Sequence, residues 1–437
     1  MYICRENETE IFKSFENMFI SALLGPRRVG KTTLVKRYID THLERKWVQL
    51  NMDERKQRQR IANDELLLMI EESALQKVGN KEKIWVVIDE AQKCPELFDQ
   101  VKILYDQFKN NKIKFILTGS AHLNLHQLAA ETLAGRVDLL RLREFNLREI
   151  TGLLNKEISL QYKTALHMIF NSKDIESLEE LCSSMRPFQQ LLSQSLDQQL
   201  LWGGLPEVLE LESEKQRLKY LSNYLQTYLE KDIREISSIG DLTLYENLMK
   251  IMAEQTGSLK DDQKVINALQ CSRNTIQKYQ AYLIATWQYV EVEPYIGNTL
   301  KRLVKSPKMY LKNNGLISYF TGIIDLLILN QTGLIGHRFE NWFLNELNSF
   351  MDSLSEFHKI YFWRTHSGQE VDFVVQIGQK IVPFEVTYST QTLPKKIRNL
   401  KAFLEDESKA AFAIYLYRGA LKFDKENKIL FLPPWMI

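Results

Sequence analysis

An α/β fold is expected for the first third of this 437-residue chain, and two observations predict it. Short apolar runs alternate with amphipathic stretches of helical spacing. Each run is as brief and as continuously apolar as a buried parallel strand requires, with helices covering both faces of the sheet. The expected strands are Phe19–Leu24, Trp47–Leu50, Ile84–Ile88, Ile113–Leu117 and Val137–Leu142, and the helices between them include Lys31–Leu43 and Glu96–Phe108.

The rest of the chain changes character twice. From about residue 149 to 235 Leu, Gln, Glu and Lys at helical spacing predict an all-helical region, broken clearly at Trp202–Pro206. Residues 241–332 then read as short helices followed by strands. Beyond residue 333, a helix at Arg338–Met351 precedes three strand patterns, at Ile360–Arg364, Val371–Ile377 and Ile381–Tyr388. At roughly 150 residues per domain, the length allows two to four domains.

Composition excludes several classes of protein. The formal net charge is +2, so any surface for nucleic acid has to be local. The four cysteines are scattered, without the spacing of a zinc site or a disulfide framework, which favours a reducing cytoplasm. No run approaches the ~18 apolar residues of a membrane span, and the N-terminus lacks a signal-peptide pattern. We therefore expect a cytoplasmic protein with no membrane partner.

A phosphate-binding loop follows the first expected strand and opens the next helix. The run Gly25–Thr32 matches GxxxxGK[ST] at every fixed position. The glycines let backbone N–H groups face phosphate oxygens, Lys31 brings a cation to the β- and γ-phosphates, and Thr32 can bind Mg²⁺. We expect ATP and Mg²⁺ as ligands. The expected nucleotide-binding residues are Gly25, Pro26, Arg27, Arg28, Val29, Gly30, Lys31, Thr32 and Thr33.

Two further strand ends carry polar residues suited to the same chemistry. Ile84–Ile88 leads directly into Asp89 and Glu90. Asp89 is expected to hold Mg²⁺, and Glu90 to orient or deprotonate the attacking water. The strand Ile113–Leu117 ends in Thr118 and Ser120, either of which could contact the γ-phosphate or the lytic water; an ordinary polar turn is the alternative.

The runs GPRRVGKTTL, WVVIDEAQK, LTGSAH and LAGRV together resemble a prokaryotic, archaeal-type group of AAA+ ATPases with a C-terminal domain of unknown function. The resemblance extends along the chain. It implies an AAA+ core at 1–150, in which the strand carrying Thr118 lies between the two motif strands, and a helical lid at 151–240. It also implies that Arg136 is an arginine finger, often supplied by a neighbouring subunit of a homo-oligomer. A surface ion pair is the alternative role for Arg136.

Residues 241–332 read as a winged-helix domain. Asp261–Leu269 and Arg273–Trp287 predict two helices, with Ser272 as the N-cap of the second, and Tyr289–Val292 predicts a strand. Arg273, Asn274, Gln277 and Lys278 begin the second helix, where base-reading side chains lie. A basic run follows, which could contact DNA phosphates or simply be solvated: Lys301, Arg302, Lys305, Lys308 and Lys312.

Residues 333–437 resemble a restriction-endonuclease-like fold. Glu340, Asp372 and Glu385 stand in the order in which that fold places its Mg²⁺-binding acids. Thr387 stands where that fold carries a lysine, which argues against efficient cleavage and for a degenerate domain. Lys380 could substitute only if the geometry allows it.

The leading hypothesis is an Mg²⁺-dependent ATPase whose cycle drives a C-terminal module that engages DNA or a protein partner. A slow, ATP-switched binding protein and an ATP-gated nuclease are the alternatives.

Overall fold

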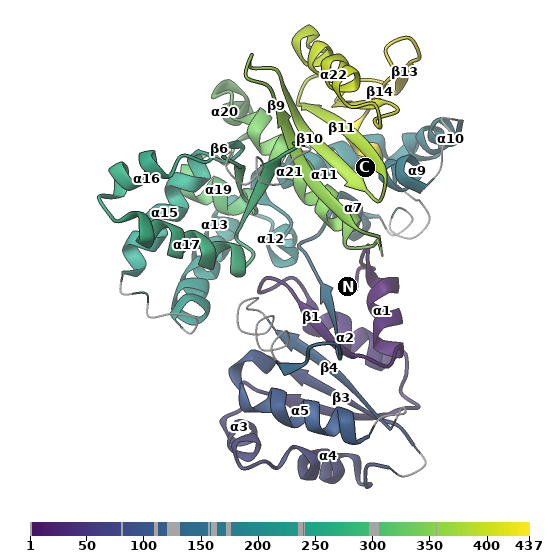
Figure 1. Cartoon of the computed structure of the whole chain (residues 1–437), viewed down its shortest axis with the longest axis vertical. Helices are drawn as coiled ribbons and strands as arrows, with labels where there is room; N and C mark the ends of the chain where they lie inside the picture. Colours follow the sequence, from purple (N-terminus) through teal and green to yellow (C-terminus); the bar gives the residue numbers. More distant parts are fainter. Residues whose placement is uncertain are drawn as a thin grey trace.

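The computed structural model describes residues 2–79, 82–108, 112–119, 132–155, 158, 164–171, 176–234, 239, 241–296, 306–354 and 356–437. Figure 1 shows two parts joined by a narrow waist: a lower lobe built from the N-terminal residues and a larger upper part built from the rest. The N-terminus lies near the waist, and the C-terminus lies in the upper part (Figure 1).

The lower lobe contains a five-stranded parallel sheet, as the alternation of strand and helix patterns predicts. Its strands are β1 (Ile20–Leu24), β2 (Lys46–Asn51), β3 (Ile84–Asp89), β4 (Ile113–Gly119) and β5 (Val137–Arg141). The order is β2-β3-β4-β1-β5, so β4 lies between the two strands that end in the phosphate loop and the acidic pair. All five expected strands are confirmed, to within a few residues at their ends.

Helices cover both faces of this sheet because its apolar side chains alternate between them. The helices are α1 (Glu8–Glu16), α2 (Lys31–Asp40), α3 (Arg55–Ala62), α4 (Leu66–Ala74) and α5 (Glu96–Gln107). Leu23, Val87 and Ile116 pack with α1 and α2. Ala22, Val86 and Leu117 point the other way and pack with α3, α4 and α5. The carboxyl ends of β1 and β3 are left clear for the loops that follow them.

The expected helical region is confirmed. Its helices are α7 (Leu147–Leu154), α9 (Ala165–Asn171), α10 (Glu176–Met185), α11 (Gln189–Trp202), α12 (Pro206–Glu210), α13 (Glu214–Thr227) and a π-helix, η3 (Tyr228–Ile233). A capping box of Asn146 and Glu149 begins α7 directly after the sheet. Gly203 ends α11 with a positive φ of 71°, which glycine adopts readily and which permits a sharp turn into α12.

The next segment contains α15 (Leu242–Glu254), β6 (Ser258–Leu259), α16 (Asp262–Leu269), α17 (Arg273–Ala285), β7 (Tyr289–Pro294) and β8 (Lys308–Leu311). Ser272 caps α17 as expected, accepting a hydrogen bond from the backbone N–H of Thr275 at 3.1 Å. The helix–turn–helix followed by strands therefore lies where the sequence predicts it.

The last segment contains α19 (Asn314–Thr321), α20 (Leu326–Gln331), α21 (Ile335–Met351), β9 (His358–Arg364), β10 (Glu370–Ile377), β11 (Lys380–Thr387), α22 (Pro394–Asp406), β12 (Ala413–Tyr417), β13 (Lys422–Asp424) and β14 (Ile429–Leu432). The sheet of this part continues into the preceding segment. Strand β9 pairs in parallel with β7, so β6–β14 form one nine-stranded sheet, β13-β14-β12-β11-β10-β9-β7-β8-β6. No helix in the described part of the chain has the length and apolar character needed to cross a membrane.

Candidate nucleotide-binding site

The phosphate loop connects the carboxyl end of β1 to the start of α2. Gly25 packs against the end of β5 so closely that a Cβ atom there would lie 2.1 Å from the backbone oxygen of Leu142. Gly30 is the N-cap of α2, with a left-handed φ of 95° that favours glycine. The two fixed glycines of the motif are therefore required by a close backbone approach and by a left-handed turn, respectively.

Lys31 is buried at the start of α2, and its ammonium group lies within the loop. Its Nζ donates to the backbone oxygens of Gly25 and Pro26, at 2.9 and 2.7 Å. The loop thus wraps around the cation that the motif assigns to the β- and γ-phosphates. The first N–H groups of α2 lie beside it, where the helix dipole favours an anion.

The acidic end of β3 meets the phosphate loop, as the strand order requires. Asp89 Oδ2 accepts a hydrogen bond from Thr32 Oγ1 at 3.0 Å, and Asp89 Oδ1 accepts one from Thr118 Oγ1 at the end of β4. Hydroxyl and carboxylate oxygens are the ligands that Mg²⁺ prefers. The residues present therefore fit a magnesium ion, with Thr32 and Asp89 as its ligands.

Glu90 follows Asp89 in a left-handed conformation, φ 52°, which is uncommon for a residue with a side chain. Such conformations concentrate at functional sites because the surrounding structure has to hold them. The side chain accepts a hydrogen bond from Gln92 Nε2 and lines the same cavity as Lys31 and Thr32. Glu90 thus lies beside the phosphate loop, where an acid that orients water is needed.

The cavity at this loop has a volume of about 460 Å³ and lies between the sheet and the helical region. Several of its lining residues were missed by the sequence reasoning: Tyr2, Arg5, Glu207 and Lys231. Arg5 donates to the backbone oxygens of Val29, at 2.8 Å, and of Arg143. Glu207 of α12 pairs with Arg28 at 3.0 Å across the cavity. No motif marks these four residues, because tertiary packing alone brings them to the loop.

Of the remaining expected catalytic residues, one is not described and one lies away from this site. Ser120 lies outside the described residues. Arg136 directly precedes β5, and its backbone oxygen accepts from the N–H of Ile20 at the start of β1. Because β1 and β5 are parallel, Arg136 and the phosphate loop lie at opposite ends of the paired strands, roughly 20 Å apart at ~3.3 Å per residue. Its guanidinium makes a bidentate pair with Asp106, both contacts at 2.9 Å. Arg136 therefore does not belong to the nucleotide site of its own chain.

The basic run after α17 does not form one surface. Lys301, Arg302 and Lys305 lie outside the described residues. Lys308 is buried on β8 and pairs with Glu340 and Glu370, at 2.9 and 2.6 Å. The expectation that Lys308 contacts DNA phosphates is therefore wrong, because acids in the protein interior already bind its ammonium group. Lys312 lies apart from it, in a cleft between the lobes.

The acids of the nuclease-like region do come together, but with a lysine that the sequence reasoning missed. Lys396 on α22 lies 2.6 Å from Asp372 Oδ2 and 2.8 Å from Glu385 Oε2. Burial alone would raise the pKa of Asp372, but the ammonium groups of Lys396 and Lys308 hold it below its ordinary value. Burial and the neighbouring Asp372 raise the pKa of Glu385.

Thr387 therefore does not leave this region without a lysine. Lys380, the substitute considered from sequence, points elsewhere and donates to the backbone oxygen of Phe170. Lys308 occupies the other side of the cluster beside Glu340. Within the described ranges no three acidic, histidine or cysteine side chains are arranged to hold a metal ion. Two lysines, rather than a free set of carboxylates, form the centre of this cluster.

Comparison with known proteins agrees with this architecture. Residues 17–151 match a family model described as an AAA domain, and residues 193–327 and 335–436 match two models described as domains of unknown function, DUF8612 and DUF4143. Over 429 residues the chain is 24% identical to the uncharacterized protein Rv2008c of Mycobacterium tuberculosis, covering 98% of this chain and 83% of that protein. The uncharacterized protein MJ1544 of Methanocaldococcus jannaschii is 25% identical over 274 residues, 60% of this chain and 54% of that protein.

Among solved structures, the ORC2 protein of Aeropyrum pernix in its ADP form has a TM-score of 0.34 and 12% identity, covering 73% of this chain and 93% of that one. AMPPCP-bound DnaA from Aquifex aeolicus has a TM-score of 0.28 and 14% identity, covering 65% and 89%. These overall similarities are low and say nothing about what this chain binds.

A parallel sheet in this order, with the phosphate loop after β1 and the acidic pair after β3, defines the AAA+ class of P-loop ATPases. Within this chain, the part that matches the AAA domain is followed by two parts that match domains of unknown function.

Proposed function

We propose that this protein binds and hydrolyses ATP with Mg²⁺. We also propose that the bound nucleotide controls the C-terminal part of the chain, which engages DNA or a protein partner. The observation that carries the first part is the 3.0 Å contact between Thr32 and Asp89, which brings the two complementary motifs together at one edge of the sheet. If the first motif were an ordinary glycine turn, or the second a solvated acidic strand end, there would be no reason for Thr32 and Asp89 to be in contact.

The roles follow from where each side chain lies. Lys31, inside the loop, stabilises the β- and γ-phosphates, while Thr32 and Asp89 hold Mg²⁺, which neutralises charge on the phosphates when bound. Glu90 orients or deprotonates the attacking water, and Thr118 keeps Asp89 in place. Ser120, two residues beyond Thr118, is the further residue that we assign to the γ-phosphate or the water.

Coupling to the rest of the chain is supported by contacts on both sides of the phosphate loop. Arg28 is held by Glu207 of the helical region, and Gly25 packs on Leu142, at the end of β5. Arg5 joins the loop to the backbone of Arg143, in the segment that connects β5 to α7. A nucleotide that repositions the loop has to strain or break these contacts, so its binding is transmitted to α7, α12 and the lobes beyond.

A role for Arg136 in hydrolysis requires a second copy of the chain, because Arg136 lies at the amino-terminal end of β5. Its own phosphate loop lies at the other end of these strands. The end of the sheet at Arg136 also exposes Met18, by 69%. We propose that the protein assembles with itself when ATP is bound, and that Arg136 leaves Asp106 to reach the neighbour's γ-phosphate. An arginine in that position can accelerate hydrolysis by ~10³-fold or more.

The test separates binding from hydrolysis. Lys31→Ala should lose most of its ATP affinity because the loop loses its cation. Glu90→Gln should bind ATP normally and hydrolyse it very slowly, because binding does not need the carboxylate. Equilibrium binding of a fluorescent ATP analogue and single-turnover hydrolysis measure the two effects. Glu96→Gln, on the exposed first turn of α5, is a matched control that should behave as wild type. Near-wild-type turnover in Glu90→Gln would remove that residue from the mechanism.

If the protein is instead a slow ATP-switched binding protein, its nucleotide site is the same and only its rate of ATP hydrolysis is lower. Turnover that DNA or a partner stimulates supports a working ATPase. A constant rate on the scale of many minutes supports a timed binding protein. For the proposed DNA contact, the exposed start of α17, with Arg273, Asn274 and Lys278, is the described surface that fits a recognition helix.

A further inference from the structure

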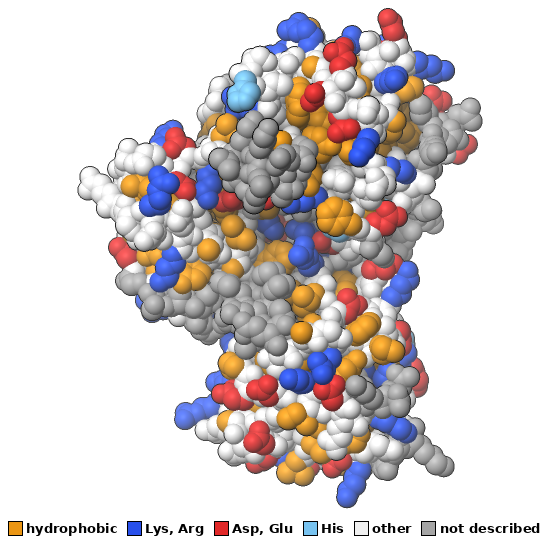
Figure 2. Space-filling view, in the orientation of Figure 1, with side chains coloured by type: hydrophobic (Ala, Val, Ile, Leu, Met, Phe, Trp, Pro, Cys, Tyr) orange, Lys and Arg blue, Asp and Glu red, His pale blue; other side chains and the backbone are white. Residues whose placement is uncertain are grey.

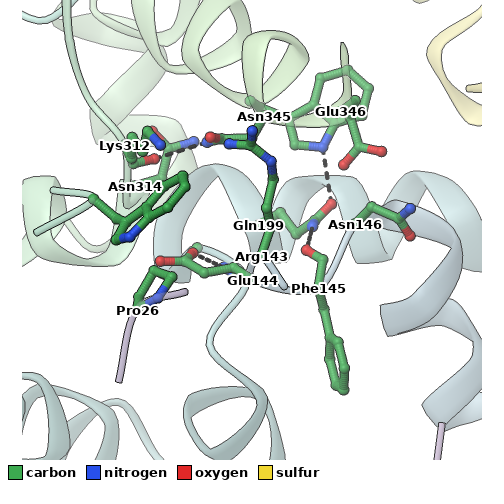
Figure 3. Close-up of a pocket in the computed structure, with 14 residues that line it drawn as sticks. Pro26, Arg143, Glu144, Phe145, Asn146, Gln199, Lys312, Asn314, Asn345 and Glu346 are labelled. Carbon is green, nitrogen blue, oxygen red and sulfur yellow. Dashed lines mark hydrogen bonds between the residues drawn. The ribbon is translucent and has the colours of Figure 1, made fainter. Parts of the chain in front are cut away.

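A small cavity adjoins the phosphate loop next to the nucleotide cavity. Its volume is about 40 Å³, and it is lined by Pro26, by the linker after β5, by the turn that follows α11, by Lys312 and by α21 (Figure 3). Pro26 lines this cavity, whereas the next residue, Arg27, lines the nucleotide cavity. The two cavities thus adjoin each other at the phosphate loop, and Phe145 lines both of them.

Positively charged side chains gather around the ring of Trp287, which lines this cavity; Lys312 and Arg143 line it too, and Arg141 lies on the same ring outside the cavity lining. Lys312 Nζ lies 4.9 Å from the ring centroid, and the guanidinium carbons of Arg141 and Arg143 lie 5.3 and 5.8 Å from it. Figure 2 shows Lys and Arg side chains inside the hollow between the lower lobe and the upper part. Because the whole chain carries a net charge of only +2, this gathering is a local feature.

Only one of these three charges is balanced by an acid in the part of the chain that the structure describes. Arg143 pairs with Asp352 at the end of α21, with Nη2 3.1 Å from Oδ1. The side chains of Lys312 and Arg141 form no hydrogen bond or ion pair with any residue that the structure describes. Burial, and then the repulsion from Arg143 and Arg141, lowers the pKa of Lys312 to about 7 despite the attraction of Asp352 and Glu144. Lys312 is half-buried and has no acidic partner within the described ranges, so this cavity can accept an anion.

The acids that line the cavity do not supply that anion. Glu144 Oε2 accepts from Asn313 Nδ2 at 2.7 Å and from the N–H of Gly204 at 3.2 Å, beside Pro26 (Figure 3). Glu346 accepts from the N–H of Leu147 at 2.9 Å, and burial raises its pKa well above the ordinary value. Both carboxyls therefore accept from other donors and form no ion pair with Lys312.

We infer that this cavity is a second anion site, separate from the nucleotide site, which takes one phosphate group or a similarly small oxyanion through Lys312, with Arg143 and Arg141 adding charge. A volume of about 40 Å³ corresponds to roughly three water molecules. That space admits the oxygens of a single phosphate and excludes a nucleoside. The phosphate belongs either to a nucleic-acid strand lying in the cleft or to a free oxyanion. The site does not depend on ATP hydrolysis, but its occupant touches the phosphate loop at Pro26.

Sulfate is a suitable probe, because it remains a dianion at neutral pH. Calorimetric titration at constant ionic strength should use the full chain carrying Lys31→Ala, so that the phosphate loop does not bind the probe. Adding Lys312→Gln should weaken sulfate binding at least ~10-fold, the loss expected for a charge-assisted hydrogen bond. Arg141→Gln, at an exposed position, should weaken it as well.

The matched control is Lys83→Gln, because Lys83 also lies over a tryptophan, 4.5 Å from the Trp85 ring. This variant should bind sulfate as tightly as the Lys31→Ala parent. Equal sulfate affinity in the Lys312→Gln and Lys83→Gln variants, or no binding to the parent, would overturn the proposal. A further arm identifies the source. Competition between sulfate and labelled single-stranded DNA that disappears in Lys312→Gln points to a strand, whereas Lys312-dependent sulfate binding without competition points to a free oxyanion.

Discussion

Removing the ammonium group of Lys396 should be among the most damaging single changes in the C-terminal sheet. Lys396→Met keeps the length of the side chain but leaves Asp372, 7% exposed, and Glu385, 1% exposed, without the cation that lies 2.6 and 2.8 Å from them. Breaking a buried pair by deleting one partner costs about 3–5 kcal/mol, because an uncompensated charge stays behind. At ~2–4 °C per kcal/mol, the melting temperature of this part should fall by roughly 6 °C or more.

Differential scanning fluorimetry at pH 7 measures this loss, and Lys395→Met is the control. Lys395 is the preceding residue on α22, it is exposed, and it makes no ion pair with a residue in the described part of the chain. The deficit of Lys396→Met should narrow on acidification from pH 7 to about 5. Without the lysine the two carboxyls have raised pKa values, so the folded variant binds more protons than its unfolded chain in that window, and its stability rises as pH falls.

A second variant tests whether the unpaired charge of Asp372 causes this loss of stability. Adding Asp372→Asn to Lys396→Met removes the stranded charge, so the double variant should recover part of the lost stability, with a coupling energy of about 1 kcal/mol or more. If Lys396→Met and Lys395→Met melt within 1 °C of each other at pH 7, Lys396 does not neutralise buried acids and this account of the cluster is wrong.

Three further predictions follow from the same structure. Arg136→Ala should bind ATP normally and hydrolyse it poorly, and a mixture with Glu90→Gln should regain activity; unchanged turnover in steady-state assays would remove Arg136 from the site. Plasmid or single-stranded DNA incubated with the protein, ATP and Mg²⁺ or Mn²⁺ should not be cut, because Lys396 and Lys308 already neutralise the acids; cleavage that Asp372→Ala abolishes would contradict this. Alanine substitution of three basic residues should weaken DNA binding for all sequences and reduce its salt dependence, as measured by fluorescence anisotropy over a range of salt concentrations. Those residues are Lys301, Arg302 and Lys305. If the wild type binds no DNA at low salt, a protein partner is favoured.

The absence of cleavage is now expected for a different reason than the sequence suggested. The sequence predicts no cleavage because Thr387 occupies the lysine position. The structure brings a lysine to the acids from a helix that begins seven residues later, at Pro394. A lysine on a following helix has no fixed spacing to the strand, so a motif search along the chain does not find it.

The sequence by itself determined the five parallel strands, the helical region, the phosphate loop and the acidic strand end. Each of these is encoded over a few neighbouring residues, by the spacing of apolar side chains, by glycines that a turn requires, or by carboxylates directly after a buried strand. Strand order then followed from the class of fold that those local signals define.

Only the tertiary structure decided which distant residues meet. It paired Arg28 with Glu207, 179 positions away, placed Arg136 at the far edge of its own sheet, and buried Lys308 among acids instead of exposing it to DNA. It also joined β7 to β9 in one sheet and brought Lys312 and Arg143 to the same wall of a cavity. These contacts between distant residues depend on how each helix is rotated and how the sheets pack. Many weak contacts across the chain together set that packing, and no local run of residues does.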